Sequence, residues 1–148
     1  MANVSTFIGT NFMNRQAPYG FGIRFFVNDD KSVYANVTFD DSKEGGKDIL
    51  HGGAIATVLD EAMGAAAYEA ESAGYTATMT YNYHAHIPLY QDIAIKAWVE
   101  RVEGKKIFTA CEAKLPNETI AVRGTALFIA SPDLHKYIKE NPYLPENE

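Results

Sequence analysis

Two adjacent carboxylates follow a His-Gly-Gly sequence in the first half of this chain. His51, Gly52 and Gly53 open a stretch of small side chains and good helix formers that continues to about Ala70. We predict a helix that begins at the two glycines, so that its first backbone N–H groups have no side chain in front of them. Such a helix end suits a developing negative charge or a carbonyl oxygen.

Asp60 and Glu61 are the two carboxylates, in the middle of the predicted helix. At about 100° per residue they fall on opposite flanks of its apolar face. Ala56 and Ala67 share the flank of Asp60 and are small enough to let another surface or a ligand approach. Each carboxylate is a candidate general base or nucleophile that substitution can test separately. The predicted apolar face comprises Ile55, Val58, Leu59, Ala62, Met63 and Ala66.

Length and composition indicate one globular domain over residues 1–148, with residues 1–20 as an N-terminal extension and 132–148 as a C-terminal tail. The formal net charge of -6 argues against nucleic acid as a partner, because phosphate binding needs a basic surface. We find no secretory signal and no apolar stretch of membrane-spanning length, so we expect a cytoplasmic protein.

The sequence offers few metal ligands or reactive thiols. Cys111 is the single cysteine, which excludes an internal disulfide, and its alternating apolar surroundings predict a buried structural thiol. His84 and His86 would share one face of a strand. No third ligand accompanies them, so we expect a hydrogen-bonded pair and no metal site.

The remaining elements are predicted to form a sheet around the helix. Hairpins between strands imply antiparallel pairing, and a single helix with a broad apolar stripe must pack on that sheet. Residues 7–13 contain Phe7, Ile8, Phe12 and Met13 and could form a short amphipathic helix or lid. The predicted strands are residues 23–27, 32–39, 75–86, 92–102, 106–115 and 119–131, with a short helix at 133–140.

The His-Gly-Gly sequence, with a carboxylate nine residues after the histidine on an Ala-rich helix, resembles the signature of hotdog-fold acyl-CoA thioesterases. The similarity is to the 4-hydroxybenzoyl-CoA thioesterase superfamily, in its phenylacetate-pathway and thioesterase-superfamily-member-like branch. Weaker similarities at residues 82–89, 102–108 and 126–129 extend it over roughly residues 33–130. The resemblance implies an α+β hotdog fold, in which an antiparallel sheet wraps around one long central helix.

The resemblance also implies an activity, the hydrolysis of acyl-CoA or acyl-carrier-protein thioesters to free acid and thiol. The backbone N–H of Gly52 would stabilise the oxyanion, and Asp60 would activate water or attack directly. Glu61 is the alternative acid. Thr78 falls where relatives hold the attacking water, and His51 would orient the loop before the helix.

Coenzyme A enters as part of the substrate, and no other cofactor is implied. Gly53, Lys105 and Lys106 are candidate contacts for it. The resemblance implies a site shared between two subunits, hence a homodimer, and a homotetramer is compatible. Gly45 departs from the pattern, because several relatives carry an Asn about six residues before the His.

Two other functions are open on the same fold. A non-catalytic acyl-CoA-binding module would bind tightly without turnover and would be indifferent to Asp60. A hotdog dehydratase or hydratase would act on the acyl chain through a catalytic histidine in a different motif, which His51 and Asp60 do not match well.

Overall fold

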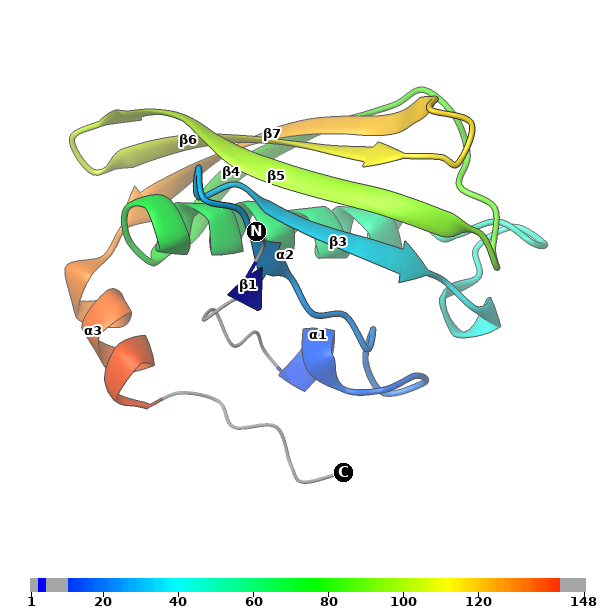
Figure 1. Ribbon diagram of the computed structural model, residues 1–148, viewed down its shortest axis with the longest axis horizontal. Helices are drawn as coiled ribbons and strands as arrows, with labels where there is room; N and C mark the ends of the chain where they lie inside the picture. The colour runs from blue at the N-terminus through cyan, green and yellow to red at the C-terminus, as the bar shows by residue number, and fades with distance from the viewer. Residues whose placement is uncertain (1–2, 5–10, 142–148) are drawn as a thin grey trace.

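The computed structural model describes residues 3–4 and 11–141, and in that part a seven-stranded sheet covers one long helix (Figure 1). The elements in chain order are β1 (Asn3–Val4), α1 (Asn11–Asn14), β2 (Phe26–Val27), β3 (Val33–Thr38), the 3-10 turn η1 (Asp41–Lys43), α2 (Gly52–Ala70), β4 (Gly74–Tyr83), β5 (Asp92–Glu103), β6 (Lys106–Lys114), β7 (Ile120–Ala130) and α3 (Pro132–Glu140).

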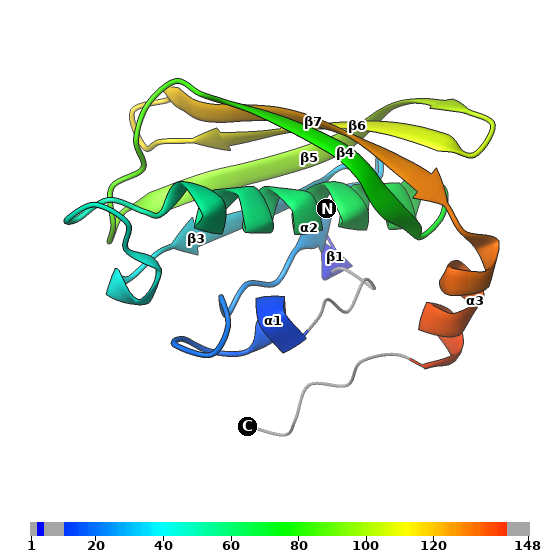
Figure 2. The same cartoon turned by 180° about the vertical axis from the view of Figure 1, so that it is seen from behind.

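The sheet has the strand order β1-β2-β3-β5-β6-β7-β4, and each neighbouring pair is antiparallel. Helix α2 lies along one face of the curved sheet, and α1 lies on the side of α2 away from it (Figures 1 and 2). This arrangement confirms the predicted hotdog fold. None of the helices in the described ranges is long and apolar enough to cross a membrane.

Helix α2 begins at Gly52 and ends at Ala70, as predicted. Its buried side chains combine alanines with larger aliphatic residues, and Gly64 faces the ring of Phe128 on β7. The residues of the predicted apolar face are all buried, together with Ala65 and Ala67. Burial of this stripe is what holds the helix on the sheet, because helices in proteins are stabilised largely by packing an apolar face.

The N-terminal region differs from the prediction. The predicted strand at residues 23–27 is reduced to the two residues of β2. The N–H groups of Gly22 and Ile23 donate instead to the carbonyls of Arg15 and Met13, so this segment pairs with the region around α1. Of the predicted N-terminal helix, α1 contains Phe12 and Met13, while Phe7 and Ile8 lie outside the described residues.

Strand β4 departs from strict alternation at one point, a register shift between Thr76 and Thr78. Thr76 pairs with the buried Phe128, whereas Thr78 pairs with Leu127 on the outer face. Directly paired residues share a face of the sheet. Thr76 therefore faces α2 and Thr78 faces away from it, although a strict period of two along the strand would place both on one face. The strand also ends at Tyr83, so His84 and His86 do not lie on a strand face.

Candidate active site

The first turn of α2 leaves one backbone donor available. The imidazole Nδ1 of His51 accepts the N–H of Gly53 at 2.9 Å, which makes His51 the helix N-cap. The N–H groups of Ala54 and Ile55 donate to the carbonyl of His51 at 3.0 and 3.3 Å. The N–H of Gly52 makes no hydrogen bond to another described residue. It lies at the positive end of the helix, where an oxyanion or carbonyl oxygen would be stabilised.

At two of the three glycines near His51, an added Cβ would come close to neighbouring atoms. A Cβ at Gly53 would lie 3.1 Å from atoms of the His51 ring, so the second glycine leaves room for the cap. At Gly52 the nearest atom to a Cβ is in the Tyr83 ring, at 3.8 Å. A Cβ at Gly45 would lie 2.9 Å from the Cα of His51. An Asn, as in the relatives, would therefore require this loop to shift.

Two tyrosines of β4 hold the first turns of α2 in place. The hydroxyl of Tyr83 donates to the carbonyl of Gly52 at 2.8 Å, and that of Tyr81 donates to the carbonyl of Ala56 at 3.1 Å. Two residues along a strand advance about 6.6 Å and four along a helix about 6 Å, so both bonds form together. Burial raises the pKa of both hydroxyls, which keeps them protonated as donors.

Asp60 follows Ala56 by four residues on α2, about one helical turn further from Gly52. The hydroxyl of Thr76 donates to Oδ1 of Asp60 at 2.9 Å, and the register shift after Thr76 is what turns this hydroxyl toward the helix. The carboxylate is about half buried, and burial raises its pKa above the ordinary value of 3.8, opposed by the hydrogen bond from Thr76. Asp60 is thus an oriented carboxylate with an enhanced affinity for a proton, as a general base requires.

Glu61 lies on the opposite flank of α2, as predicted. Its side chain is partly buried, and Oε1 is enclosed by surrounding atoms. The structure therefore separates the two carboxylates and places only Asp60 beside Thr76 and the edge strand.

Three other candidates lie apart from Gly52 and Asp60 within the chain. Thr78 lies on the outer face of the sheet with Arg101 and Leu127, so its predicted role with the attacking water stays a prediction. Lys105 and Lys106 lie in and beside the β5–β6 hairpin, where the carbonyl of Lys105 accepts the N–H of Ala130 at the end of β7. Ala130 pairs with Gly74, which follows the last residue of α2 by four residues. Gly52 begins the opposite end of this helix, roughly 28 Å away along its axis.

The prediction of a buried thiol at Cys111 is confirmed. Burial raises its pKa to about 12, so the thiol remains protonated and unreactive. Within the described residues no group of three or more His, Cys, Asp or Glu side chains could hold a metal ion. His84 and His86 instead line a cavity beside Gly52.

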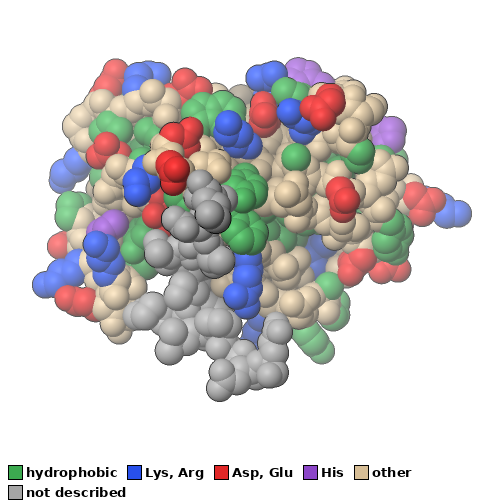
Figure 3. Space-filling model, viewed as in Figure 1, with side chains coloured by type: hydrophobic (Ala, Val, Ile, Leu, Met, Phe, Trp, Pro, Cys, Tyr) green, Lys and Arg blue, Asp and Glu red, His purple; other side chains and the backbone are tan. Residues whose placement is uncertain are grey.

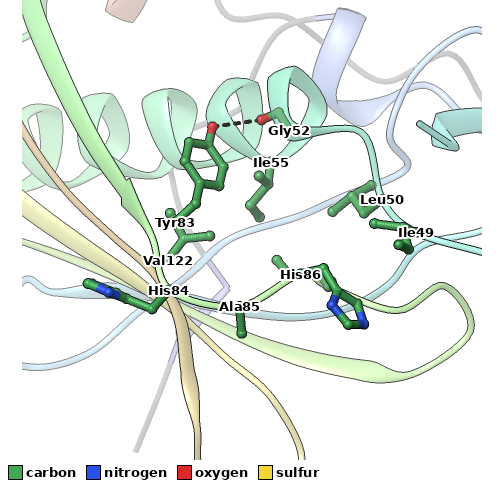
Figure 4. Close-up of a pocket in the computed structure, with 10 residues that line it drawn as sticks. Ile49, Leu50, Gly52, Ile55, Tyr83, His84, Ala85, His86 and Val122 are labelled. Carbon is green, nitrogen blue, oxygen red and sulfur yellow. Dashed lines mark hydrogen bonds between the residues drawn. The ribbon is translucent and has the colours of Figure 1, made fainter. Parts of the chain in front are cut away.

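That cavity has a volume of about 340 Å³ and lies between the start of α2, the loop before it and the end of β4 (Figure 4). Its walls are largely aliphatic and aromatic, formed by Ile49, Leu50, Ile55, Tyr83, Ile87 and Val122. Acidic and basic side chains are interspersed over the face of the molecule shown in Figure 3, without a single extended basic surface.

Comparison with known proteins identifies the class to which this fold and helix belong. The model of the thioesterase superfamily matches residues 47–121, which include α2, β4, β5 and β6. The chain therefore belongs to the thioesterase superfamily. It is 38% identical over 87 residues to acyl-coenzyme A thioesterase THEM4 of Xenopus laevis, a match that covers 58% of this chain and 39% of that protein. The chain spans less than half the length of the curated relatives it matches.

Solved structures share the fold. A thioesterase superfamily protein is 28% identical, with a TM-score of 0.73 over 75% of this chain and 57% of the other. A Streptococcus mutans protein bound to acetyl CoA is 14% identical, with a TM-score of 0.69 over 74% and 88% of the two chains. The PaaI protein from the phenylacetic acid degradation operon of E. coli is also 14% identical, with a TM-score of 0.69 over 75% and 80%.

Three residues that hold this site in place, Thr76, Tyr81 and Tyr83, do not stand out in the sequence. Strict alternation along the strand assigns Thr76 to the same face as Thr78. A single-residue bulge is not visible in such a pattern, so the sequence does not indicate that Thr76 faces the helix. The residue type of Tyr81 and Tyr83 alone does not distinguish them from residues that line an acyl pocket or pack in the core. The two tyrosines are two residues apart on a strand, and the carbonyls that they bind are four residues apart on a helix. This matched spacing is the signal that could have identified them.

The cap formed by His51 can be tested by stability. Replacing His51 with Ala removes the acceptor for the Gly53 N–H and should lower the free energy of unfolding by about 1 kcal/mol, whereas His51→Asn should retain most of it, because Asn is a good N-cap. Denaturant unfolding followed by circular dichroism at fixed protein concentration measures both. Equal losses in the two variants would contradict the capping role.

Proposed function

We propose that this protein is an enzyme that hydrolyses acyl-CoA or acyl-carrier-protein thioesters. The observation that carries the proposal is an available helix N-terminal amide at Gly52, together with an oriented, half-buried carboxylate at Asp60. Membership of the thioesterase superfamily, the similarity to a relative named an acyl-coenzyme A thioesterase, and a structural neighbour that binds acetyl CoA support the same reaction and substrate class.

The two groups supply what thioester hydrolysis needs. The carbonyl oxygen accepts the N–H of Gly52, which stabilises the negative charge that develops when the carbonyl carbon is attacked. In one route Asp60 takes a proton from water, the water oxygen bonds to the carbonyl carbon, the C–S bond breaks, and the proton passes to the thiolate. In the other, Asp60 itself displaces the thiolate, and water then hydrolyses the resulting anhydride. Neither route uses a cofactor beyond the CoA of the substrate.

Thr76 is proposed as the residue that positions Asp60. Its hydroxyl occupies one carboxylate oxygen, so the other oxygen is directed at the water or the substrate. Glu61 has no corresponding place in the scheme, because it lies on the opposite flank of the helix. His51 acts as the cap that leaves Gly52 as the free donor.

The proposed working unit contains two copies of the chain. Asp60 follows Gly52 by eight residues on one helix, so the amide and the carboxylate are separated by about 12 Å along the axis. One thioester carbon cannot lie within about 3.5 Å of the carboxylate while its oxygen binds that amide. We therefore propose that each site combines Gly52 of one copy with Asp60 of a second.

Strand β4 provides the surface for such an association. It lies at one end of the strand order and is ten residues long. Tyr75, Met79 and Tyr83 expose 62%, 44% and 52% of their surface along it. A long edge strand with exposed apolar side chains is a template for pairing with another chain. We propose a homodimer that pairs through this edge, with a tetramer as a possible higher assembly.

Removal of the Gly52 N–H tests the oxyanion site directly. Gly52→Pro deletes the donor, and proline is well tolerated at the first position of a helix. His51 already has the extended backbone (φ -60°, ψ 132°) that the residue before a proline adopts. We expect kcat for an acyl-CoA to fall by about 10²- to 10³-fold. Gly52→Ala, which keeps the N–H and places its Cβ at van der Waals distance from Tyr83, should stay within a few-fold of the unmodified protein.

Thiol release from a panel of acyl-CoA thioesters measures these rates. Equal activity of the two Gly52 variants would exclude the amide as the oxyanion donor. Tight binding of the thioesters with no turnover by the folded, unmodified protein would instead favour the non-catalytic acyl-CoA-binding module.

Asp60→Asn separates the catalytic from the structural effect of the carboxylate. The amide oxygen can still accept from Thr76, but the group no longer ionises, so hydrolysis should be lost while Glu61→Gln remains active.

Because burial raises the pKa of Asp60, the folded protein loses stability as pH rises from the unfolded pKa through the folded one. Asp60→Asn should therefore raise Tm at pH 7, and the gain should vanish near pH 3, where Asp60 is protonated in both states.

The same raised pKa should appear in catalysis. In the unmodified protein kcat/KM should fall as pH decreases through the pKa of Asp60, with a midpoint above 3.8. Thermal unfolding by calorimetry and a pH profile of thiol release provide the two measurements. A Tm gain that does not depend on pH would show that ionisation of Asp60 is not its cause. Loss of turnover only in Glu61→Gln would assign the reaction to the other carboxylate.

A further inference from the structure

We infer that the cavity beside Gly52 receives the acyl group of the thioester and limits its length. The inference rests on the proposed function, because it places the reacting carbonyl at the Gly52 amide. It adds the substrate class: an apolar acyl group of medium length or a single aromatic ring.

The chemistry of the cavity walls matches an apolar guest. Ile49, Leu50, Ile55 and Val122 present aliphatic side chains from the loop, the helix and β7 (Figure 4). The hydroxyl of Tyr83 already donates to the carbonyl of Gly52. His84 and His86 also line the cavity, and both are exposed to solvent. The aliphatic part of the wall offers a polar guest few partners, and an unmade hydrogen bond inside an apolar site is costly.

The volume sets the size of the guest. An apolar cavity of about 150 Å³ holds one benzene ring. At about 340 Å³, this cavity has room for a ring or a medium-length alkyl chain. Ligand pockets of this kind start at about 300 Å³, so the space lies at the small end of the usual range.

The lining of the cavity does not suit the coenzyme A part of the substrate, which we place outside it. Among the described residues that line the cavity none is a lysine or arginine, the side chains that bind phosphate groups best. The pantetheine arm carries amides that need hydrogen-bond partners. Apart from its oxygen, a thioester carbonyl carbon held at Gly52 bears two substituents, the hydrocarbon part of the acyl group and the sulfur. With the acyl group in the cavity, the sulfur and the nucleotide point toward solvent.

Ile49 is the residue to vary, because it is only partly buried and belongs to the loop before the helix. Ile49→Trp should fill the cavity and Ile49→Ala should enlarge it. Ile129, a partly buried isoleucine of β7 that does not line the cavity, provides the matched controls Ile129→Trp and Ile129→Ala. Circular dichroism and Tm verify that each variant folds.

The first readout is kcat/KM for acetyl-, octanoyl- and dodecanoyl-CoA. Ile49→Trp should lower the ratio of octanoyl to acetyl activity by about tenfold or more, since one or two methylenes in an apolar pocket change kcat/KM by such factors. Ile49→Ala should raise the ratio of dodecanoyl to octanoyl activity, and both ratios should be unchanged in the Ile129 variants. The Ala variant tests the inference even if the Trp variant fails to fold. A loss that is the same for all three chain lengths would overturn it, because the cavity would then hold the pantetheine arm.

The second readout is binding, which does not depend on hydrolysis. Calorimetry with the S-octyl thioether of CoA and with CoA alone should show that Ile49→Trp weakens binding of the thioether and leaves CoA unaffected. If no acyl-CoA is hydrolysed and this difference is still found, the proposed function fails and the acyl pocket stands. If the thioesters are hydrolysed and CoA binding is weakened equally, the function stands and the pocket assignment fails.

Discussion

Three hydrogen bonds from the edge strand β4 to helix α2 determine the geometry of this site. Side chains of β4 reach the helix at Gly52, Ala56 and Asp60, which follow one another at intervals of four residues. The strand and the helix run antiparallel. Two strand residues separate Tyr83 from Tyr81 and four helix residues separate Gly52 from Ala56, so the rises of strand and helix match over this first interval. The last bond depends on the bulge after Thr76, which turns a hydroxyl toward the helix that would otherwise face the outer surface. The same row of contacts thus holds the parts of α2 that carry the Gly52 N–H and the Asp60 carboxylate.

This row also keeps the two reacting groups apart. The N–H of Gly52 and the carboxylate of Asp60 are fixed on one rigid helix about 12 Å apart, a distance that no side-chain rotation can close. If both groups act on one thioester, as we propose, a second copy of the chain must supply one of them. The exposed apolar side chains of β4 explain how the copies would meet, since the strand that positions each group also forms the edge of the sheet.

Much of this account was predictable from the sequence. The helix from Gly52 to Ala70 follows from glycines, apolar spacing and small side chains, and the hairpin turns predicted the antiparallel sheet. Asp60 could be chosen over Glu61 from a helical wheel and the family signature. The partners of Asp60 could not be found, because a bulge leaves no trace in an alternating sequence and inverts the face of every residue beyond it. The reduction of the first strand was equally hidden, since backbone bonds around α1 depend on tertiary contacts.

The most direct test is to mix two inactive variants, Asp60→Asn and Gly52→Pro, after separating and reassociating their subunits. If each site combines Gly52 of one copy with Asp60 of another, half of the dimers will be mixed, and each mixed dimer will contain one intact site. Thiol release should then recover to about a quarter of that of the unmodified protein at equal concentrations. Mixed dimers that form, as shown by native mass spectrometry, yet remain inactive would contradict a shared site.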